Sequence, residues 1–185
     1  MSMKTALRLP VVAAGSEYLV MGHLMRRNIL TYKAPPGNEG YDLICIHPDP
    51  RYKPKRGQVS QVRVQVKSRY ATDCHLGFPL KERSIAAFDF LIAAFLNIGN
   101  YYRGRDGTEG GRDSDFYTIP SEVIRELHVK SSSWEKVLLK PLGDKLGSYH
   151  NEAGFELIAK ALGVPRPQKV RMDDEGERTR VGRLK

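Results

Sequence analysis

The sequence has little cysteine. Cys45 and Cys74 are its two cysteines, and neither belongs to a paired or repeated spacing, which excludes a disulfide framework as the basis of the fold. The reducing interior of the cell, the cytoplasm, is therefore the expected location. Cys45, His47, Cys74 and His75 are residue types that bind zinc, but their spacing is unlike that of zinc sites. A buried Cys45 thiol is the preferred interpretation.

Long apolar runs are also missing. The longest, over residues 88–98, is broken by Asp89 and Asn97, and the first ten residues lack the apolar core of a secretory signal. The sequence therefore predicts no membrane span and no membrane partner. It also shows no internal repeat.

Acidic residues are outnumbered, because 21 Asp and Glu stand against 30 Lys and Arg and give a formal net charge of +9. This excess favours an anionic partner such as nucleic acid. Hydrophobic residues (41%) and charged residues (28%) occur in the proportions of a folded protein. We expect one domain over residues 1–165, followed over residues 166–185 by a charged tail suited to a mobile arm or to ordering on a partner.

Apolar spacing and turn residues predict an α/β fold, with a central mixed sheet of about four or five strands flanked by helices. The run 88–95 is apolar enough for a buried strand, although a helix is a live alternative there. The segment 47–57 is rich in proline and is expected to be a projecting hairpin tip, and the glycine-rich segment 99–115 a flexible loop. The expected helices cover residues 13–27, 121–128 and 151–162, with a helical turn over 82–87, and the expected strands cover residues 29–33, 41–46, 59–68, 88–95 and, as the last, 116–119.

Four polar residues fall at informative places in these elements. Glu17 lies in the first turn of the first helix, Asp42 in the second strand, and Gln65 and Lys67 in the third. Period-two geometry puts Gln65 and Lys67 on the same strand face, opposite the valines at 62, 64 and 66, so both side chains can point toward Asp42. A lysine at such a position needs a carboxylate, water or solvent beside it.

A cluster of this kind suits phosphodiester hydrolysis, in which a divalent ion stabilises charge on the phosphate and activates water. Hard oxygen ligands favour Mg²⁺ or Mn²⁺. Asp42 is expected to hold the ion, with Glu17 bound to it directly or through water and the Gln65 side-chain oxygen assisting, while Lys67 orients or activates the attacking water. In the plainer interpretation Asp42 and Lys67 are solvated strand residues, and Glu17 complements the helix dipole.

The ordered set resembles the PD-(D/E)XK nuclease superfamily, the restriction-endonuclease-like fold. The matching text is Gly-Ser-Glu-Tyr-Leu-Val at 15–20, Gly-Tyr-Asp-Leu-Ile at 40–44 and Val-Gln-Val-Lys-Ser at 64–68. A looser match at 88–93 and 116–120 resembles the small-endonuclease, homing-endonuclease and junction-resolvase-like branches. Gln65 departs from the usual acidic residue of the triplet. The resemblance implies a metal-dependent endonuclease with catalytic Glu17, Asp42, Gln65 and Lys67, and with the Val66 backbone as a further metal ligand.

DNA is the expected partner, and a homodimer or higher homo-oligomer the expected assembly, because symmetry-related sites commonly make paired cuts. Trp134 and Tyr149 are expected to pack rather than to stack on bases. One rival function is a nucleic-acid-binding protein that keeps the nuclease fold without catalysis, and another is an unrelated α/β enzyme with its site elsewhere. The cations expected to grip the DNA backbone, with solvated loops as the alternative, are Arg51, Lys53, Lys55, Arg56, Arg69, Arg103, Arg105 and Arg112.

Overall fold

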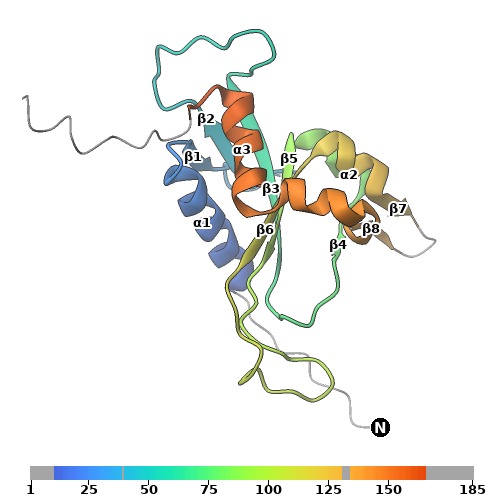
Figure 1. Cartoon of the computed structure of the whole chain (residues 1–185). Coiled ribbons are helices and arrows are strands. Elements are labelled where there is room, and N and C mark those ends of the chain that lie inside the picture. The colour runs from blue at the N-terminus through green and yellow to red at the C-terminus, as the bar shows by residue number, and fades with distance from the viewer. Residues whose placement is uncertain (1–10, 39, 131–133, 166–185) are drawn as a thin grey trace, which may run out of the picture.

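The computed structural model describes residues 11–38, 40–130 and 134–165. The expected tail over residues 166–185 lies outside the described residues. A five-stranded sheet forms the centre of the molecule, with strand order β1-β2-β3-β5-β6 (Figure 1). β3 pairs with β5 in parallel, and every other neighbouring pair is antiparallel, so the predicted mixed sheet is confirmed. The strands are β1 (Leu30–Lys33), β2 (Leu43–Ile46), β3 (Gln61–Arg69), β5 (Phe90–Phe95) and β6 (Asp115–Pro120).

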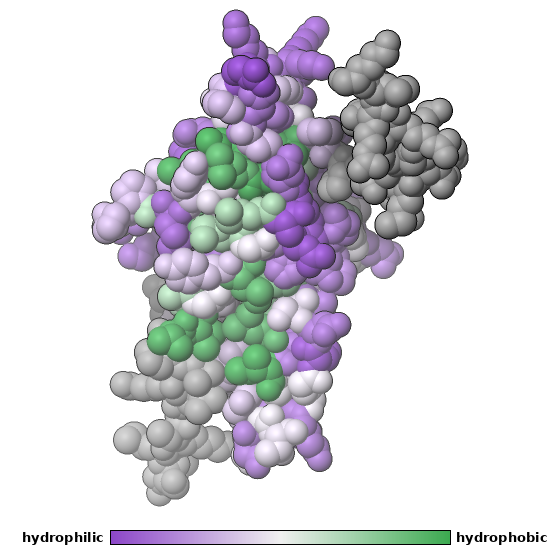
Figure 2. Space-filling model, turned by 90° about the vertical axis from the view of Figure 1, so that its left-hand side faces the viewer, coloured by the Kyte–Doolittle hydropathy of each residue, from purple (hydrophilic) through white to green (hydrophobic). Residues whose placement is uncertain are grey.

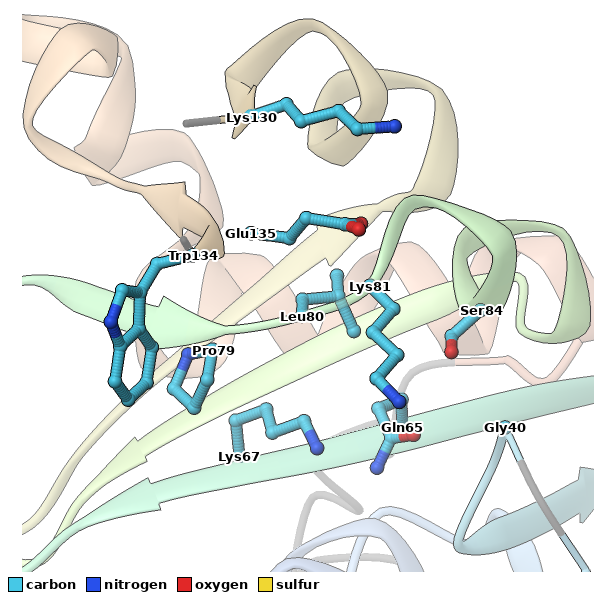
Figure 3. A pocket seen from close by; sticks show the side chains of 10 residues that line it. All are labelled: Gly40, Gln65, Lys67, Pro79, Leu80, Lys81, Ser84, Lys130, Trp134 and Glu135. Carbon is cyan, nitrogen blue, oxygen red and sulfur yellow. The ribbon is translucent and has the colours of Figure 1, made fainter. Parts of the chain in front are cut away.

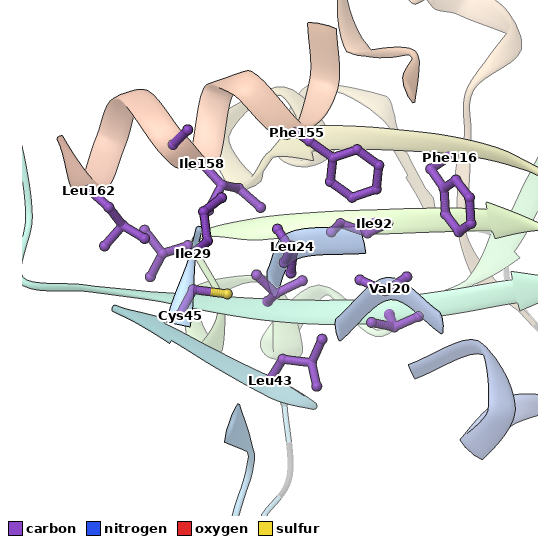
Figure 4. Packing of buried hydrophobic residues seen from close by; sticks show 14 of the residues in the cluster. Val20, Leu24, Ile29, Leu43, Cys45, Ile92, Phe116, Phe155, Ile158 and Leu162 are labelled. Carbon is purple, nitrogen blue, oxygen red and sulfur yellow. The ribbon is translucent and has the colours of Figure 1, made fainter. Parts of the chain in front are cut away.

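Two helices, α1 (Val12–Met25) and α3 (Asn151–Leu162), cover one face of this sheet. Between them and the sheet lies a hydrophobic core of fully buried side chains (Figure 4). The predicted alternation of β3 is confirmed, since its three valines enter this core while Gln65 and Lys67 occupy the opposite face. The core residues contributed by the helices and by the sheet include Val20, Leu24, Leu43, Val64, Ile92, Phe155, Ile158 and Leu162.

The opposite face of the sheet carries a second core. There Leu91, Phe95 and Ile119 pack against the 3-10 helix η1 (Glu82–Ala87) and the helix α2 (Ser121–Leu127). β5 is therefore buried on both faces, which explains an apolar run without alternation. The strand interpretation of residues 88–95 is confirmed.

A second, three-stranded sheet closes this side of the molecule, and the sequence did not predict it. It consists of β4 (Gly77–Pro79), β7 (His128–Lys130) and β8 (Glu135–Leu138), in the order β4-β8-β7. The expectation that 116–119 is the last strand is wrong, because two strands follow it. Strands of three and four residues are too short to produce a clear alternating pattern.

The long connection η2 (Lys140–Tyr149) leads from β8 into α3. At its end His150 donates from Nε2 to the Asp115 carboxylate at 2.8 Å, and Asn97 donates to the same carboxylate at 3.0 Å. Arg112 adds an ion pair to Asp115. Burial would raise the pKa of Asp115, but these three donors outweigh it and hold that pKa below its usual value.

α1 is apolar on its outward face as well as on its inward one. Val11, Tyr18, Leu19 and Met25 expose between 39% and 75% of their surface. Figure 2, which looks onto this side of the molecule, shows hydrophobic residues gathered in a band rather than scattered. A helix that is hydrophobic all round is ordinarily covered on all sides.

The remaining connections run along the outside. The segment 47–57 joins antiparallel strands β2 and β3 as a projecting hairpin connection, as predicted. It returns to the body at Val59, whose N–H donates to the Ala161 carbonyl at 2.9 Å. Within the described residues, no helix combines the length and apolarity needed to cross a membrane.

Candidate active site

Asp42 stands immediately before β2 and is held against β3 by its backbone and by its side chain. Its N–H donates to the Val64 carbonyl at 2.9 Å, which continues the β2–β3 pairing by one residue. Its Oδ2 atom accepts the Val66 N–H at 2.7 Å and a further hydrogen bond from Gln65 Nε2. These bonds fix the carboxylate beside the middle of β3.

Gln65 is 7% exposed, and its amide nitrogen sits between two oxygens. Nε2 donates to Asp42 Oδ2 and also to the Val66 carbonyl, 3.2 Å away. The amino group therefore occupies the point on which a carboxylate and a backbone carbonyl converge. Rotation of the amide by half a turn about its last bond brings Oε1 to the same place.

The oxygen atoms of these groups would fit a hard divalent cation as ligands. The Asp42 carboxylate, the Gln65 amide oxygen and the Val66 carbonyl are the oxygen ligands that Mg²⁺ and Mn²⁺ accept. Among the described residues, no group of three or more His, Cys, Asp and Glu is placed to hold a metal ion. In the set above, Asp42 is the one carboxylate, and the other two oxygens belong to amide groups.

Glu17 has a different partner from the one expected. Its carboxylate forms an ion pair with Lys33 at the end of β1, and the Lys33 ammonium also lies 5.2 Å from the centre of the Tyr18 ring. Lys33 pairs with Leu43 in the sheet, one residue beyond Asp42. The sequence reasoning overlooked Lys33, since no periodicity links positions 17 and 33. The ligand role of Glu17 stays a prediction.

Lys67 is half-buried and lies two residues beyond Gln65 on the same strand face. Both side chains line a cleft of about 690 Å³ between β3 and the second sheet (Figure 3). Across the cleft from them are Pro79, Lys81 and Trp134. The predicted pair thus faces an open cavity rather than the core.

Trp134, which also lines this cleft, differs from its sequence-based prediction. It was expected to pack, but 68% of its surface is exposed at the start of β8, so that prediction is wrong. Tyr149 does pack, half-buried against the second core. Cys45 is buried in the first core, and burial raises its pKa to about 12, as the buried-thiol interpretation requires.

The eight candidate DNA-binding cations differ in how they are engaged. Arg51 and Arg112 form ion pairs with nearby aspartates, and Arg69 donates to the Gly77 carbonyl while lying 5.2 Å from the Phe78 ring centre. Arg69 therefore fastens β4 to β3. The two loops that carry the others reach opposite ends of the central sheet (Figure 1). The remaining five side chains, all exposed, are Lys53, Lys55, Arg56, Arg103 and Arg105.

Comparison with known proteins gives two similar structures. No protein-family model and no curated protein matches the chain. A bacterial homing endonuclease, I-Ssp6803I, is 13% identical over 82% of this chain and 93% of its own, with a TM-score of 0.47. The Holliday junction resolvase Hjc of Archaeoglobus fulgidus is 12% identical over 84% of this chain and 99% of its own, with a TM-score of 0.40. Likeness at this level transfers neither an activity nor a site residue.

Proposed function

We propose that this chain is a metal-dependent endonuclease that hydrolyses phosphodiester bonds in DNA. The observation that carries the proposal is the convergence of the Asp42 carboxylate, the Gln65 amide and the Val66 carbonyl beside a cleft that also contains Lys67. Two oxygens converge here, and rotation of the Gln65 amide would add a third, so a cation held by them would lie next to one ammonium group, as this reaction needs.

Each residue then has a part. Mg²⁺ or Mn²⁺, when bound, would stabilise the charge that develops on the phosphate. Asp42, the Gln65 side-chain oxygen and the Val66 carbonyl would hold the ion. The Val66 N–H donates to Asp42 Oδ2, which fixes the carboxylate orientation. Lys67 would position the attacking water, and its positive charge would partly offset the negative charge of the phosphate. Glu17, whose carboxylate is paired with Lys33, would contribute to the site through water.

DNA is the substrate that we propose, on the basis of the net charge of +9 and the exposed cations of the two loops. Because these loops lie at opposite ends of the central sheet, a substrate that touches both must extend along the whole of β3. The cleft with Lys67 opens from the middle of that path.

We further propose that two copies associate. The exposed apolar side chains of α1 supply a surface that a second copy would cover, and a nuclease that cuts both strands uses two symmetry-related sites. Analytical ultracentrifugation tests this. A Leu19→Glu variant, which places a charge in the apolar band, should shift the protein toward the monomer, whereas Lys160→Glu on α3 should not.

One observation favours a second candidate, a nuclease-fold protein that binds DNA without cutting it. The amino group of Gln65 donates to Asp42, so the site is satisfied without any cation. A usual acidic residue would instead add a second negative charge. This candidate predicts binding that is sensitive to salt and indifferent to divalent ions.

Cleavage of supercoiled plasmid and of a branched oligonucleotide duplex, with Mg²⁺, Mn²⁺ or chelator, separates the candidates. The endonuclease predicts cutting that needs the metal and is lost in Asp42→Asn and Lys67→Ala, with DNA binding retained. Asp144→Asn, at an exposed position of η2, and Lys136→Ala on β8 are matched controls that should cut normally. Cutting that survives Asp42→Asn would place the active site elsewhere. Binding without cutting by either the wild type or Gln65→Glu would favour the binding protein.

A further inference from the structure

The wall of the cleft that faces Gln65 and Lys67 comes from the second sheet, and its composition is unusual for a structural element. It presents an exposed tryptophan, Trp134, next to Pro79, and two lysines, Lys81 and Lys130. In Figure 3 the Lys81 side chain extends across the cleft toward Gln65, and the Trp134 indole lies beside Pro79.

We propose that this wall is a nucleotide-binding surface: Trp134 stacks on an unpaired base of the DNA substrate, and Lys81 together with Lys67 binds the adjoining phosphates. The inference rests on the proposed function for its substrate class. It adds that the substrate must present an unpaired nucleotide to the cleft.

The backbone of Trp134 adjoins a paired strand. It directly precedes β8, and Lys136 two residues later pairs with Pro79 on one side and Val129 on the other. The residue is 68% exposed, so the indole has surface open to a ligand. An exposed aromatic ring in a basic cleft is the usual platform for single-stranded bases, since every base has a face that can stack.

The charges of the wall are predominantly positive. Its one carboxylate, Glu135, accepts the Glu82 N–H at 2.6 Å. That bond, opposed by burial and aided by the charges of Lys130, His128 and Lys81, lowers the pKa of Glu135. Lys130 itself lies 3.8 Å from Glu82. Glu135 and Lys130 thus have partners within the wall. Lys67 and Lys81, which line the cleft beside the Gln65 amide, are placed to bind phosphates.

The size of the cleft limits what can enter it. A volume of about 690 Å³ is in the range of cavities that hold one small molecule. One or two nucleotides of a strand therefore fit inside it. Taking a paired base out of its stack costs a few kcal/mol, and least where the base is already unpaired. A bulge, flap or branch next to the cleavage point should thus be the preferred substrate.

The experiment uses the fact that the chain contains one tryptophan, so intrinsic fluorescence of the full-length protein reports Trp134 alone. In chelator, where no cutting occurs, the protein is titrated with a duplex that carries one unpaired nucleotide and with the fully paired duplex of the same sequence. The bulged duplex should quench the emission saturably. By anisotropy of a labelled duplex, Trp134→Ala should weaken binding of the bulged duplex roughly 5- to 100-fold and of the paired duplex by less than about twofold.

Two further variants test the charges and guard against misfolding. Trp134→Phe keeps a stacking face and should retain most of the affinity. Lys81→Ala should weaken binding of the bulged duplex and reduce the salt dependence of that binding by about one phosphate contact. Lys136→Ala, an exposed lysine of the same sheet outside the cleft, is the matched control and should change neither.

Absence of quenching by the bulged duplex, or equal weakening of both duplexes in Trp134→Ala, would overturn the proposal. Because this assay needs no metal and no cleavage, it is independent of the endonuclease activity. Quenching in a protein that never cuts would support the nucleotide-binding surface and reject the endonuclease activity. Cutting without quenching would support the endonuclease activity and reject the nucleotide-binding surface.

Discussion

Replacement of Gln65 by Glu is the most direct probe of the proposed cation site. The change removes the donor to Asp42 Oδ2 and puts a second carboxylate beside the first, at a position that is 7% exposed. Two carboxylates about 4 Å apart, at an effective dielectric constant of ~20, repel by about 4 kcal/mol. If the pair instead binds one proton at pH 7, the cost is about 1.4 kcal/mol for each pH unit by which pH 7 exceeds an ordinary Glu pKa of about 4.3. The total is again about 4 kcal/mol.

In chelator at pH 7 we therefore expect Gln65→Glu to lower the free energy of unfolding by about 4 kcal/mol. A domain of this size loses roughly 2–4 °C of Tm for each kcal/mol, so Tm should fall by about 8–16 °C. The folded-state pKa of the new Glu is raised above its unfolded value. The penalty is consequently absent below the unfolded pKa and grows as the pH rises through that value toward the folded pKa, so stability should recover near pH 4 to 5.

A divalent cation should act in the opposite direction, because it neutralises the pair. Mg²⁺ should raise the Tm of Gln65→Glu by more than it raises that of the wild type. Thermal unfolding followed by circular dichroism, at pH 7 and pH 5 with Mg²⁺ or chelator, measures all of these shifts. Gln61→Glu is the matched control, since Gln61 is exposed on the same strand, and its Tm should stay within about 2 °C of the wild type. Equal stabilisation of wild type and Gln65→Glu by Mg²⁺, or an unchanged Tm in chelator, would refute the shared cation site.

Three further predictions concern the framework. Burial raises the Cys45 pKa to about 12, so iodoacetamide at pH 8 should label Cys74 first and Cys45 only on unfolding, as peptide mass spectrometry can show; equal rates in the native protein would contradict this. The pKa of Asp115 is lowered in the folded protein, so its ionised form stabilises the fold above the unfolded pKa, and this stability is lost as the pH falls through the folded pKa. Between about pH 6 and pH 3, Asp115→Asn should therefore lose less free energy of unfolding than the wild type, as urea titrations can measure. Phe155→Ala should lower the free energy of unfolding by about 3–5 kcal/mol against less than about 0.5 kcal/mol for exposed Lys160→Ala, and similar losses in the two would argue against its core role.

Elements with strong local patterns were predictable. The observed bounds of α3 and η1 match the expected ranges 151–162 and 82–87. In α3 an apolar stripe has helical spacing, and Gly163 ends the helix in the left-handed conformation, φ 72°, that favours glycine. The strands of the central sheet were found for the same reason, because β-branched and apolar residues form runs between turn residues.

The second sheet escaped prediction because its stability does not reside in any of its strands. β4, β7 and β8 have three or four residues each and are joined by pairing between positions such as Pro79 and Lys136, far apart in the chain. Phe78 and Val137, buried between this sheet and the central one, supply the hydrophobic contact. Such strands form when the tertiary contacts exist, and local propensity says little about them.

By itself, the sequence determined the face of β3 on which Gln65 and Lys67 lie, because alternation along a strand follows from backbone geometry alone. It also predicted a strand over residues 41–46 that contains Asp42 and could run beside them, whereas in the structure this strand begins at Leu43, directly after Asp42. The tertiary structure alone decided which groups meet: that Gln65 Nε2 sits between Asp42 Oδ2 and the Val66 carbonyl, that Lys33 takes the Glu17 carboxylate, and that Trp134 faces the cleft. Gln65 and Trp134, 69 positions apart in the chain, line one cleft because two sheets pack against each other. Local sequence patterns report the direction of a side chain, whereas the choice of its partner is made by packing.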